Sequence, residues 1–86
     1  MNSGTYEIAR RLIASALGAQ LEAIGPTTAI YKIPEWDSLG QLKIVVALEK
    51  ALNVRILDEV TFESLVNVRR IAAYINNVRA ENHNGK

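Results

Sequence analysis

Ser38 is the residue whose type and setting could carry chemistry. In the stretch PEWDSLGQL (residues 34–42) its hydroxyl lies between Asp37 and Leu39, where a loop is predicted to become a helix. One interpretation is local, because a serine hydroxyl in a first helical turn can meet backbone N–H groups that lack an intrahelical partner. The other is functional, because the positive end of a helix favours a phosphate bound to that hydroxyl. The tripeptide alone favours the local role, since matches to motifs this short are weak signals.

Composition restricts the other kinds of site that the chain could build. There is no cysteine, which excludes disulfides and thiolate-metal sites. The single histidine, His83, lies in the polar stretch ENHNGK at residues 81–86, so a two-histidine metal site cannot form. A Ser-His-Asp arrangement would need this stretch to fold back on the domain. No general acid/base pair stands out either, and an independent enzyme is therefore the least favoured class of function.

The chain length predicts one small domain over residues 1–86, with its ordered part at about 4–79 and a polar tail at about 80–86. Nearly half of the residues are apolar (49%), which favours a folded globule over disorder. The sequence has no stretch long enough to cross a bilayer, and its N-terminus lacks the apolar run of a secretory signal. We therefore expect a cytoplasmic, free-standing monomer.

Helical periodicity predicts an all-α fold, namely a small bundle of three main helices and one short helix, with a long ordered loop between the first two. The predicted helices cover about residues 4–17, 37–53, 58–65 and 67–78. The residues expected to bound them favour helix ends by their chemistry: Ser3 or Thr5, Gly18, Asp37, Asn53 and Asn67. The loop at 18–36 contains glycines and prolines, but its apolar residues predict that it packs across the helices as an ordered segment.

Single side chains of the second half lead to further expectations. The second helix has a wide apolar face: Leu39, Leu42, Val45, Val46, Ala47, Leu48 and Leu52. Gly40 is expected to weaken the first turn by about 1 kcal/mol relative to alanine. Trp36 is interpreted as an anchor for the loop, and Glu49 as a solvated side chain. Later residues are predicted to lie in the core: Ile56, Phe62, Leu65, Ile71 and Ile75.

The stretch IPEWDSLGQLKIVVALEKALNVRI (residues 33–56) resembles the core of an acyl carrier protein, and LDEVTFESLVNVRRIAAYI (residues 57–75) resembles its later helices. The resemblance covers roughly residues 4–78. It implies that Ser38 carries a covalent 4′-phosphopantetheine arm, added from coenzyme A by a phosphopantetheinyl transferase. The thiol of that arm would hold acyl groups as thioesters, and the protein itself would be a non-catalytic carrier.

The resemblance also implies roles for residues around Ser38. Asp37 and Leu39 would flank the modified serine as recognition positions. Leu42, Lys43 and Val46 match the part of the second helix that partner enzymes contact, although Leu42 and Val46 could equally be core residues. The expected partners are an acyl-loading ligase or acyltransferase and downstream synthase enzymes.

The charge of this chain departs from that of fatty-acid carriers, which are strongly acidic. Ten basic and nine acidic residues give a net charge of +1, so charge alone points to neither nucleic acid nor an acidic partner. Lys43 stands where acidic residues are common in the family, and Gly40 replaces another position that is often polar or acidic. Because complementary charge governs encounter and partner choice, we expect a specialised carrier for a dedicated lipid, polyketide or other secondary biosynthetic pathway.

Three other functions remain open at this point. A peptidyl or aminoacyl carrier is ranked lower, because PEWDSL lacks the Gly-Gly pair and the histidine that usually precede the serine in such domains. A protein-interaction module could keep the fold and leave Ser38 unmodified. Binding of nucleic acid by Arg69, Arg70 and Arg79 has weak support, because basic residues are otherwise scattered among acidic ones.

Overall fold

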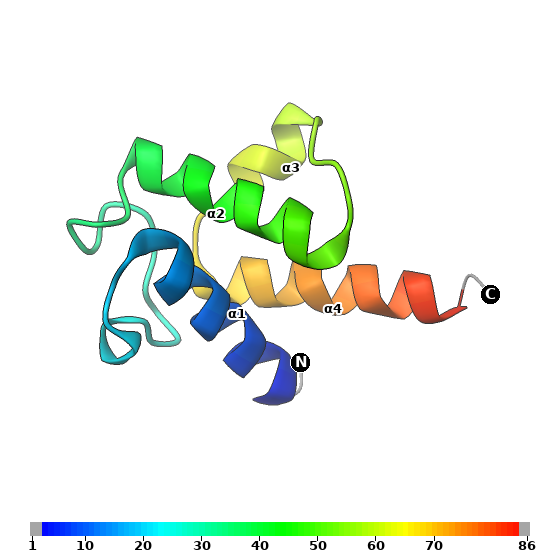
Figure 1. The fold of residues 1–86 in the computed structure, drawn as a ribbon, viewed down its shortest axis with the longest axis horizontal. Coiled ribbons are helices and arrows are strands. Elements are labelled where there is room, and N and C mark those ends of the chain that lie inside the picture. Colours follow the sequence, from blue (N-terminus) through cyan, green and yellow to red (C-terminus); the bar gives the residue numbers. More distant parts are fainter. Residues whose placement is uncertain (1–2, 85–86) are drawn as a thin grey trace.

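The computed structural model describes residues 3–84, and the side chains of residues 4–81. The helices follow the order α1 (Ser3–Leu17), the 3₁₀ turn η1 (Leu21–Ala23), α2 (Ser38–Leu52), α3 (Glu59–Ser64) and α4 (Val68–Asn84) (Figure 1). The predicted all-α bundle of three main helices and one short one is confirmed. No helix in the described part of the chain is long and apolar enough to cross a membrane.

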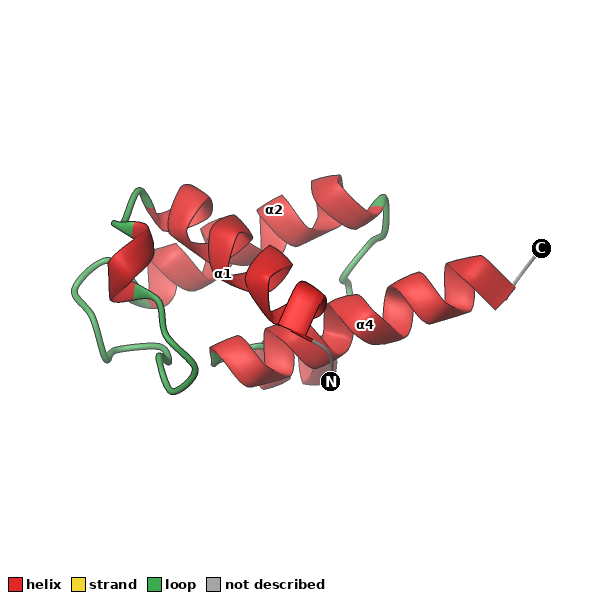
Figure 2. Ribbon diagram, turned by 90° about the horizontal axis from the view of Figure 1, so that it is seen from below, coloured by secondary structure: helices red, strands yellow, loops and turns green. Residues whose placement is uncertain are grey.

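Helix α1 packs against both α2 and α4, and the core lies where these three helices meet. Figures 1 and 2 show the loop between α1 and α2 at one end of the molecule, with the C-terminal turns of α4 extending beyond the other helices at the opposite end. Side chains from the three helices, from the loop and from residues 56 and 65 fill the core: Ile13, Leu17, Ile24, Trp36, Ile44, Leu48, Ile56, Leu65, Val68, Ile71 and Ile75. The predicted core residues are thus buried, except that Phe62 is half-buried at the edge.

The helix ends follow the local chemistry of the sequence at most positions. Gly18 has a φ of +67°, and the Ala19 N–H donates to the Ala14 carbonyl, so α1 ends at a left-handed glycine as predicted. Asn53 ends α2 with a φ of 57°. The side chain of Asn67 accepts a hydrogen bond of 2.8 Å from the Arg70 N–H, which makes it the predicted cap of α4.

Two expectations about helix ends differ from the structure. Thr5 is buried as the third residue of α1, so it does not occupy the capping position before the helix, while the side chain of Ser3 lies outside the described residues. Helix α4 continues to Asn84, through residues for which the polar composition predicted a tail. A polar sequence can remain helical at the end of a long helix, because each residue added to an existing helix gains a backbone hydrogen bond without the cost of starting a new helix.

The wide apolar face predicted for α2 is divided between core and surface. Val45 and Leu48 of this face are buried, whereas Leu39 and Val46 are exposed. Ile44, which the predicted face did not include, is buried as well. The reason is geometric: the other helices pack against only one side of α2. Periodicity alone identified apolar positions but not the side of the helix that the bundle covers.

Gly40 does more than weaken the first turn of α2. A Cβ atom at this position would collide with the Glu35 carbonyl oxygen and would lie 2.8 Å from Leu17 Cδ2. Glycine therefore allows the end of α1 and the backbone before α2 to approach the first turn of α2 closely. The expected cost in helix propensity is offset by this packing.

The loop between α1 and α2 is ordered, as predicted, because backbone groups bind it to distant elements. Its Ile30 N–H donates to the Val66 carbonyl at 2.8 Å, and its Thr28 carbonyl accepts from the Val68 N–H at 3.1 Å. On the other side, Arg10 Nε of α1 donates to the Ile24 carbonyl at 2.7 Å. These contacts fix the loop between α1 and the start of α4.

Candidate functional site

Ser38 is the first residue of α2, and its side chain is exposed. The capping role that a serine often has here belongs to Asp37, whose Oδ1 accepts a hydrogen bond of 2.9 Å from the Gly40 N–H. Ser38 is therefore not needed as the cap of α2, and the local interpretation of this serine loses its main support. Its hydroxyl lies at the positive end of a helix dipole, where added negative charge is favoured, although the Asp37 carboxylate partly opposes this.

Tyr31 supplies the hydrogen-bond partner of Ser38. Its phenol oxygen lies 2.8 Å from Ser38 Oγ, and either hydroxyl can be the donor. Tyr31 belongs to the loop before α2, and the residue is 68% exposed. The contact therefore connects the loop with the first residue of α2 at the surface of the protein.

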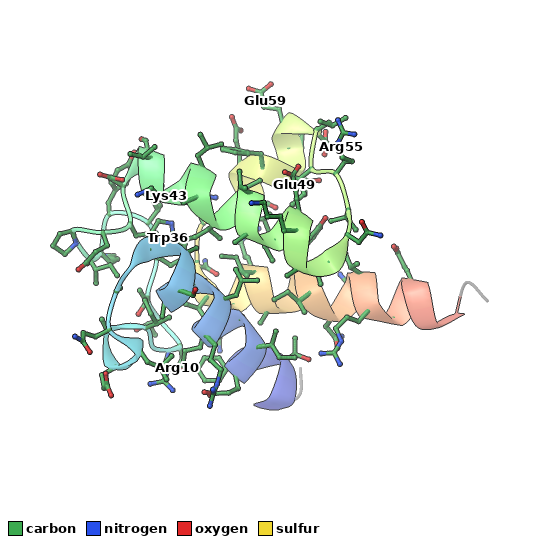
Figure 3. All side chains as sticks on the ribbon, in the orientation of Figure 1. Arg10, Trp36, Lys43, Glu49, Arg55 and Glu59 are labelled. Carbon is green, nitrogen blue, oxygen red and sulfur yellow. The ribbon has the colours of Figure 1, made fainter. Side chains whose placement is uncertain are left out.

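Beneath Ser38, Trp36 and Gln41 connect three segments of the chain. The indole Nε1 of Trp36, which is 0% exposed, donates to Gln41 Oε1 at 2.8 Å. The amide Nε2 of Gln41 in turn donates to the Leu65 carbonyl at 2.6 Å and reaches the Phe62 carbonyl at 3.4 Å. Figure 3 shows Trp36 between α1 and the first turns of α2. Its predicted role as an anchor is confirmed, and Gln41 completes it.

A groove opens beside Ser38, between the loop, α2 and α3. Its apolar lining consists of Ile30 from the loop, Phe62 of α3 and Val66 after α3. Gln41 and Glu63 are polar residues of the lining. The groove thus joins one exposed hydroxyl to an apolar surface next to it. This combination can accommodate a long flexible group that is attached at Ser38.

The outer surface near Ser38 has a mixed character. Leu39 is 59% exposed, and Leu42 and Val46 follow it on the same side of α2, so these two are surface residues rather than core. Lys43 is also exposed (Figure 3). Leu57 and Val60 add exposed apolar surface from α3 and the segment before it.

Acidic residues of this region have structural roles as well. Asp58 caps α3, and hydrogen bonds from the Thr61 hydroxyl at 2.7 Å and the Thr61 N–H at 3.0 Å lower the pKa of its carboxyl below the ordinary 3.8. Glu49 was expected to be solvated, but its Oε2 accepts a hydrogen bond of 2.8 Å from the Ile56 N–H. Glu49 therefore fixes the segment between α2 and α3. Its carboxylate also helps to raise the pKa of Tyr74, after the larger effect of burial.

The remaining candidate residues do not join this site. Arg69 and Arg70 begin the exposed side of α4, and Arg79 lies nearly three turns further on, about 15 Å along the axis at the usual helical rise. Among the described residues, no group of three or more histidine and acidic side chains is placed to hold a metal ion. The side chain of His83 lies outside the described residues.

A family model described as "Phosphopantetheine attachment site" matches residues 7–75, which include the whole candidate site, most of α1 and all of α2 and α3. The chain belongs to this family. Comparison with curated proteins gives no significant match. The protein is thus a phosphopantetheine-dependent carrier, and the resemblance to acyl carrier proteins is confirmed at the level of the family.

The cofactor of the family is 4′-phosphopantetheine, attached covalently. The residues of the site fit it, because an exposed serine hydroxyl that is not needed as a cap lies at a helix N-terminus beside a partly apolar groove. Carrier domains of this family are generally non-catalytic, and they typically interact with a phosphopantetheinyl transferase and with synthase enzymes.

Sequence reasoning missed several residues in and around the candidate site. Gln41 lies on the same side of α2 as the buried residues Ile44, Val45 and Leu48. A polar residue at this helical spacing could have indicated a buried hydrogen-bonding side chain. Tyr31 and Glu49 gave no such signal, because their partners lie in segments whose placement depends on the tertiary fold.

Proposed function

We propose that Ser38 is the attachment residue and that the protein carries acyl groups as thioesters on its 4′-phosphopantetheine arm. The supporting observation is that the residue that caps α2 and the residue with an exposed hydroxyl at its start are different residues. Asp37 caps the helix, and the Ser38 hydroxyl remains at the surface. A serine that the fold does not need as a cap, at the helix end that tolerates phosphate best, is suited to modification.

The attachment step makes specific demands on the chain. A bond forms between Ser38 Oγ and a phosphorus of coenzyme A, the pyrophosphate bond breaks, adenosine 3′,5′-bisphosphate leaves, and the serine proton passes to a base of the transferase. The N-terminus of α2 then stabilises the phosphodiester through its dipole. The terminal thiol of the arm supplies the thioester chemistry. The groove lined by Ile30, Phe62 and Val66 offers apolar surface to the arm and its cargo.

The surface around Ser38 supports a specialised carrier. Asp37 and Leu39 flank the serine, and Leu42, Lys43 and Val46 follow on α2 as the proposed contact surface for partner enzymes. Over residues 37–52 two acidic side chains (Asp37 and Glu49) balance two basic ones (Lys43 and Lys50), so a basic docking patch of a fatty-acid enzyme finds little complementary charge. We therefore infer a dedicated ligase or acyltransferase and a dedicated synthase in a lipid, polyketide or other secondary biosynthetic pathway.

Intact-mass measurement tests the attachment site. The purified protein is incubated with coenzyme A and a promiscuous phosphopantetheinyl transferase, beside Ser38→Ala and the matched control Ser15→Ala, which replaces an exposed serine of α1. We expect the wild type and Ser15→Ala to gain one phosphopantetheinyl group and Ser38→Ala to gain none, although it folds normally. A gain in Ser38→Ala would refute the site, and no gain in any protein would favour the interaction-module alternative.

A charge reversal tests the partner surface. Lys43→Glu is expected to increase acyl transfer by enzymes of generic fatty-acid synthesis, because it restores an acidic residue near Ser38. Lys50→Glu makes the same change of charge near the other end of α2 and serves as the control. Equal effects of the two variants, or slower transfer with Lys43→Glu, would show that local charge on α2 does not determine partner choice.

A further inference from the structure

Tyr31 has no role in the function proposed so far, yet within the described part of the chain it makes a side-chain hydrogen bond to Ser38. We propose that Tyr31 is a positioning residue for the transfer of the phosphopantetheine arm, through its hydroxyl, which holds Ser38 Oγ at the mouth of the groove. This inference rests on the proposed attachment at Ser38. Tyr31 touches the reacting oxygen of this protein but contributes no group to the bond that forms.

The exposure of Tyr31 argues against a purely structural role. A tyrosine that served the core would be buried, whereas Tyr31 as a whole residue is 68% exposed. Its phenol oxygen nevertheless lies 2.8 Å from Ser38 Oγ, and Tyr31 is one of the residues that line the groove beside this serine. The side chain is therefore placed by its hydroxyl contact more than by burial of its ring.

The backbone of Tyr31 carries a second, independent observation. Its φ of 70° lies in the left-handed region, which is unusual for a bulky residue and which glycine or asparagine would occupy at less cost. Neighbouring hydrogen bonds maintain it: the Tyr31 N–H donates to the Trp36 carbonyl at 2.6 Å, and the Lys32 N–H donates to the Ala29 carbonyl at 3.0 Å. A strained backbone held in this way, with the side chain directed at Ser38, indicates a local function for the ring and its hydroxyl.

The contact changes what Ser38 can do. An exposed serine without a partner samples three staggered rotamers, and only some of them direct Oγ toward an incoming phosphate. A hydrogen bond to Tyr31 favours one of these rotamers in the protein that awaits modification. Once Oγ is esterified it has no proton to donate, whereas the phenol of Tyr31 could still donate a hydrogen bond, and the phosphodiester would offer it acceptor oxygens. Tyr31 can therefore serve the serine before transfer and the phosphodiester after it.

Tyr31→Phe tests the proposal, because it removes the hydroxyl and keeps the ring. Tyr6→Phe, on the half-buried side of α1, is the matched control. Steady-state kinetics of arm transfer from coenzyme A should show a kcat about three- to tenfold lower for Tyr31→Phe with KM unchanged, the factor that corresponds to one hydrogen bond. The urea unfolding midpoint should stay unchanged, because the contact is exposed and water can replace it. The three-bond couplings between Hα and Hβ of Ser38, measured by NMR, should change from those of one rotamer to averaged values.

The outcomes separate this inference from the function on which it rests. If the wild type accepts the arm and Tyr31→Phe accepts it at the same or a higher rate, the positioning role is wrong and the carrier function stands. Unchanged Ser38 couplings in Tyr31→Phe would overturn the role as well. If the wild type accepts no arm, or Ser38→Ala does accept it, the proposed attachment site fails, and the inference fails with it.

Discussion

Replacement of Gln41 by leucine should lower the free energy of unfolding by about 2–4 kcal/mol, although leucine is more apolar and similar in size. The substitution leaves two buried groups without their partners, the indole N–H of Trp36 and the carbonyl of Leu65. A buried polar group without a partner costs about 1–3 kcal/mol, and the added apolar burial offsets part of the sum. A chain of 86 residues is typically stable by roughly 4–13 kcal/mol, so the loss would be a large share.

Urea unfolding followed by far-ultraviolet circular dichroism measures this effect. Gln20→Leu is the matched control, because Gln20 is exposed and its side chain makes no cap hydrogen bond. We expect that control to stay within about 0.5 kcal/mol of the wild type. A double-mutant cycle with Trp36→Phe isolates the hydrogen bond, because phenylalanine removes the N–H that Gln41→Leu would leave without a partner.

In the Trp36→Phe background, Gln41→Leu should cost about 1–3 kcal/mol less than in the wild type. Strictly additive costs would show that Trp36 and Gln41 do not depend on each other. A Gln41→Leu variant as stable as the wild type would refute the reasoning altogether, since it would mean that the two buried groups find other partners at no cost.

Two further predictions concern the elements on either side of the site. Gly40→Ala should destabilise the protein by about 1–2 kcal/mol in urea unfolding, because the overpacking against Glu35 and Leu17 exceeds the gain in helix propensity. Gly25→Ala is the control, because a Cβ there would meet one atom at 3.9 Å. Equal stability of the two variants would contradict the prediction. The depressed pKa of Asp58 means that its contribution to stability is present above pH 3.8 and is lost as the pH falls through the lower folded value. The NMR shift of the Thr61 amide should therefore titrate below pH 3.8, and a midpoint above 3.8 would contradict the assigned hydrogen bonds.

Local chemistry made much of the fold predictable. Gly18 and Asn53 adopt the left-handed conformation that ends a helix, and Asp37 caps α2, because these preferences depend on neighbouring backbone atoms. Residues 54–66 were harder to interpret, and a short helix from residue 58 to 65 was only one option; the structure forms it at Glu59–Ser64. The extent of α4 was less predictable, because composition does not show where a helix that is already formed must stop.

The candidate site was predictable in its centre and not in its surroundings. The motif around Ser38 identified the serine, because the residues that place it at the start of α2 are adjacent in the sequence. The partners of Tyr31 and Gln41 were not predictable, because their hydrogen bonds join the loop, α2 and the segment before α4. The same holds for Glu49, whose partner lies beyond the end of its own helix.

The sequence by itself therefore determined the three main helices, the helix ends at Gly18, Asp37, Asn53 and Asn67, and the serine that begins α2, since each depends on interactions within a few residues. Only the tertiary structure decided which apolar residues of α2 are buried. Leu39, Leu42 and Val46 have the same apolar character as Ile44, but the bundle covers one side of the helix and leaves the other to solvent. Burial is a property of packing between distant segments, and the surface beside Ser38 is the part of α2 that this packing leaves exposed.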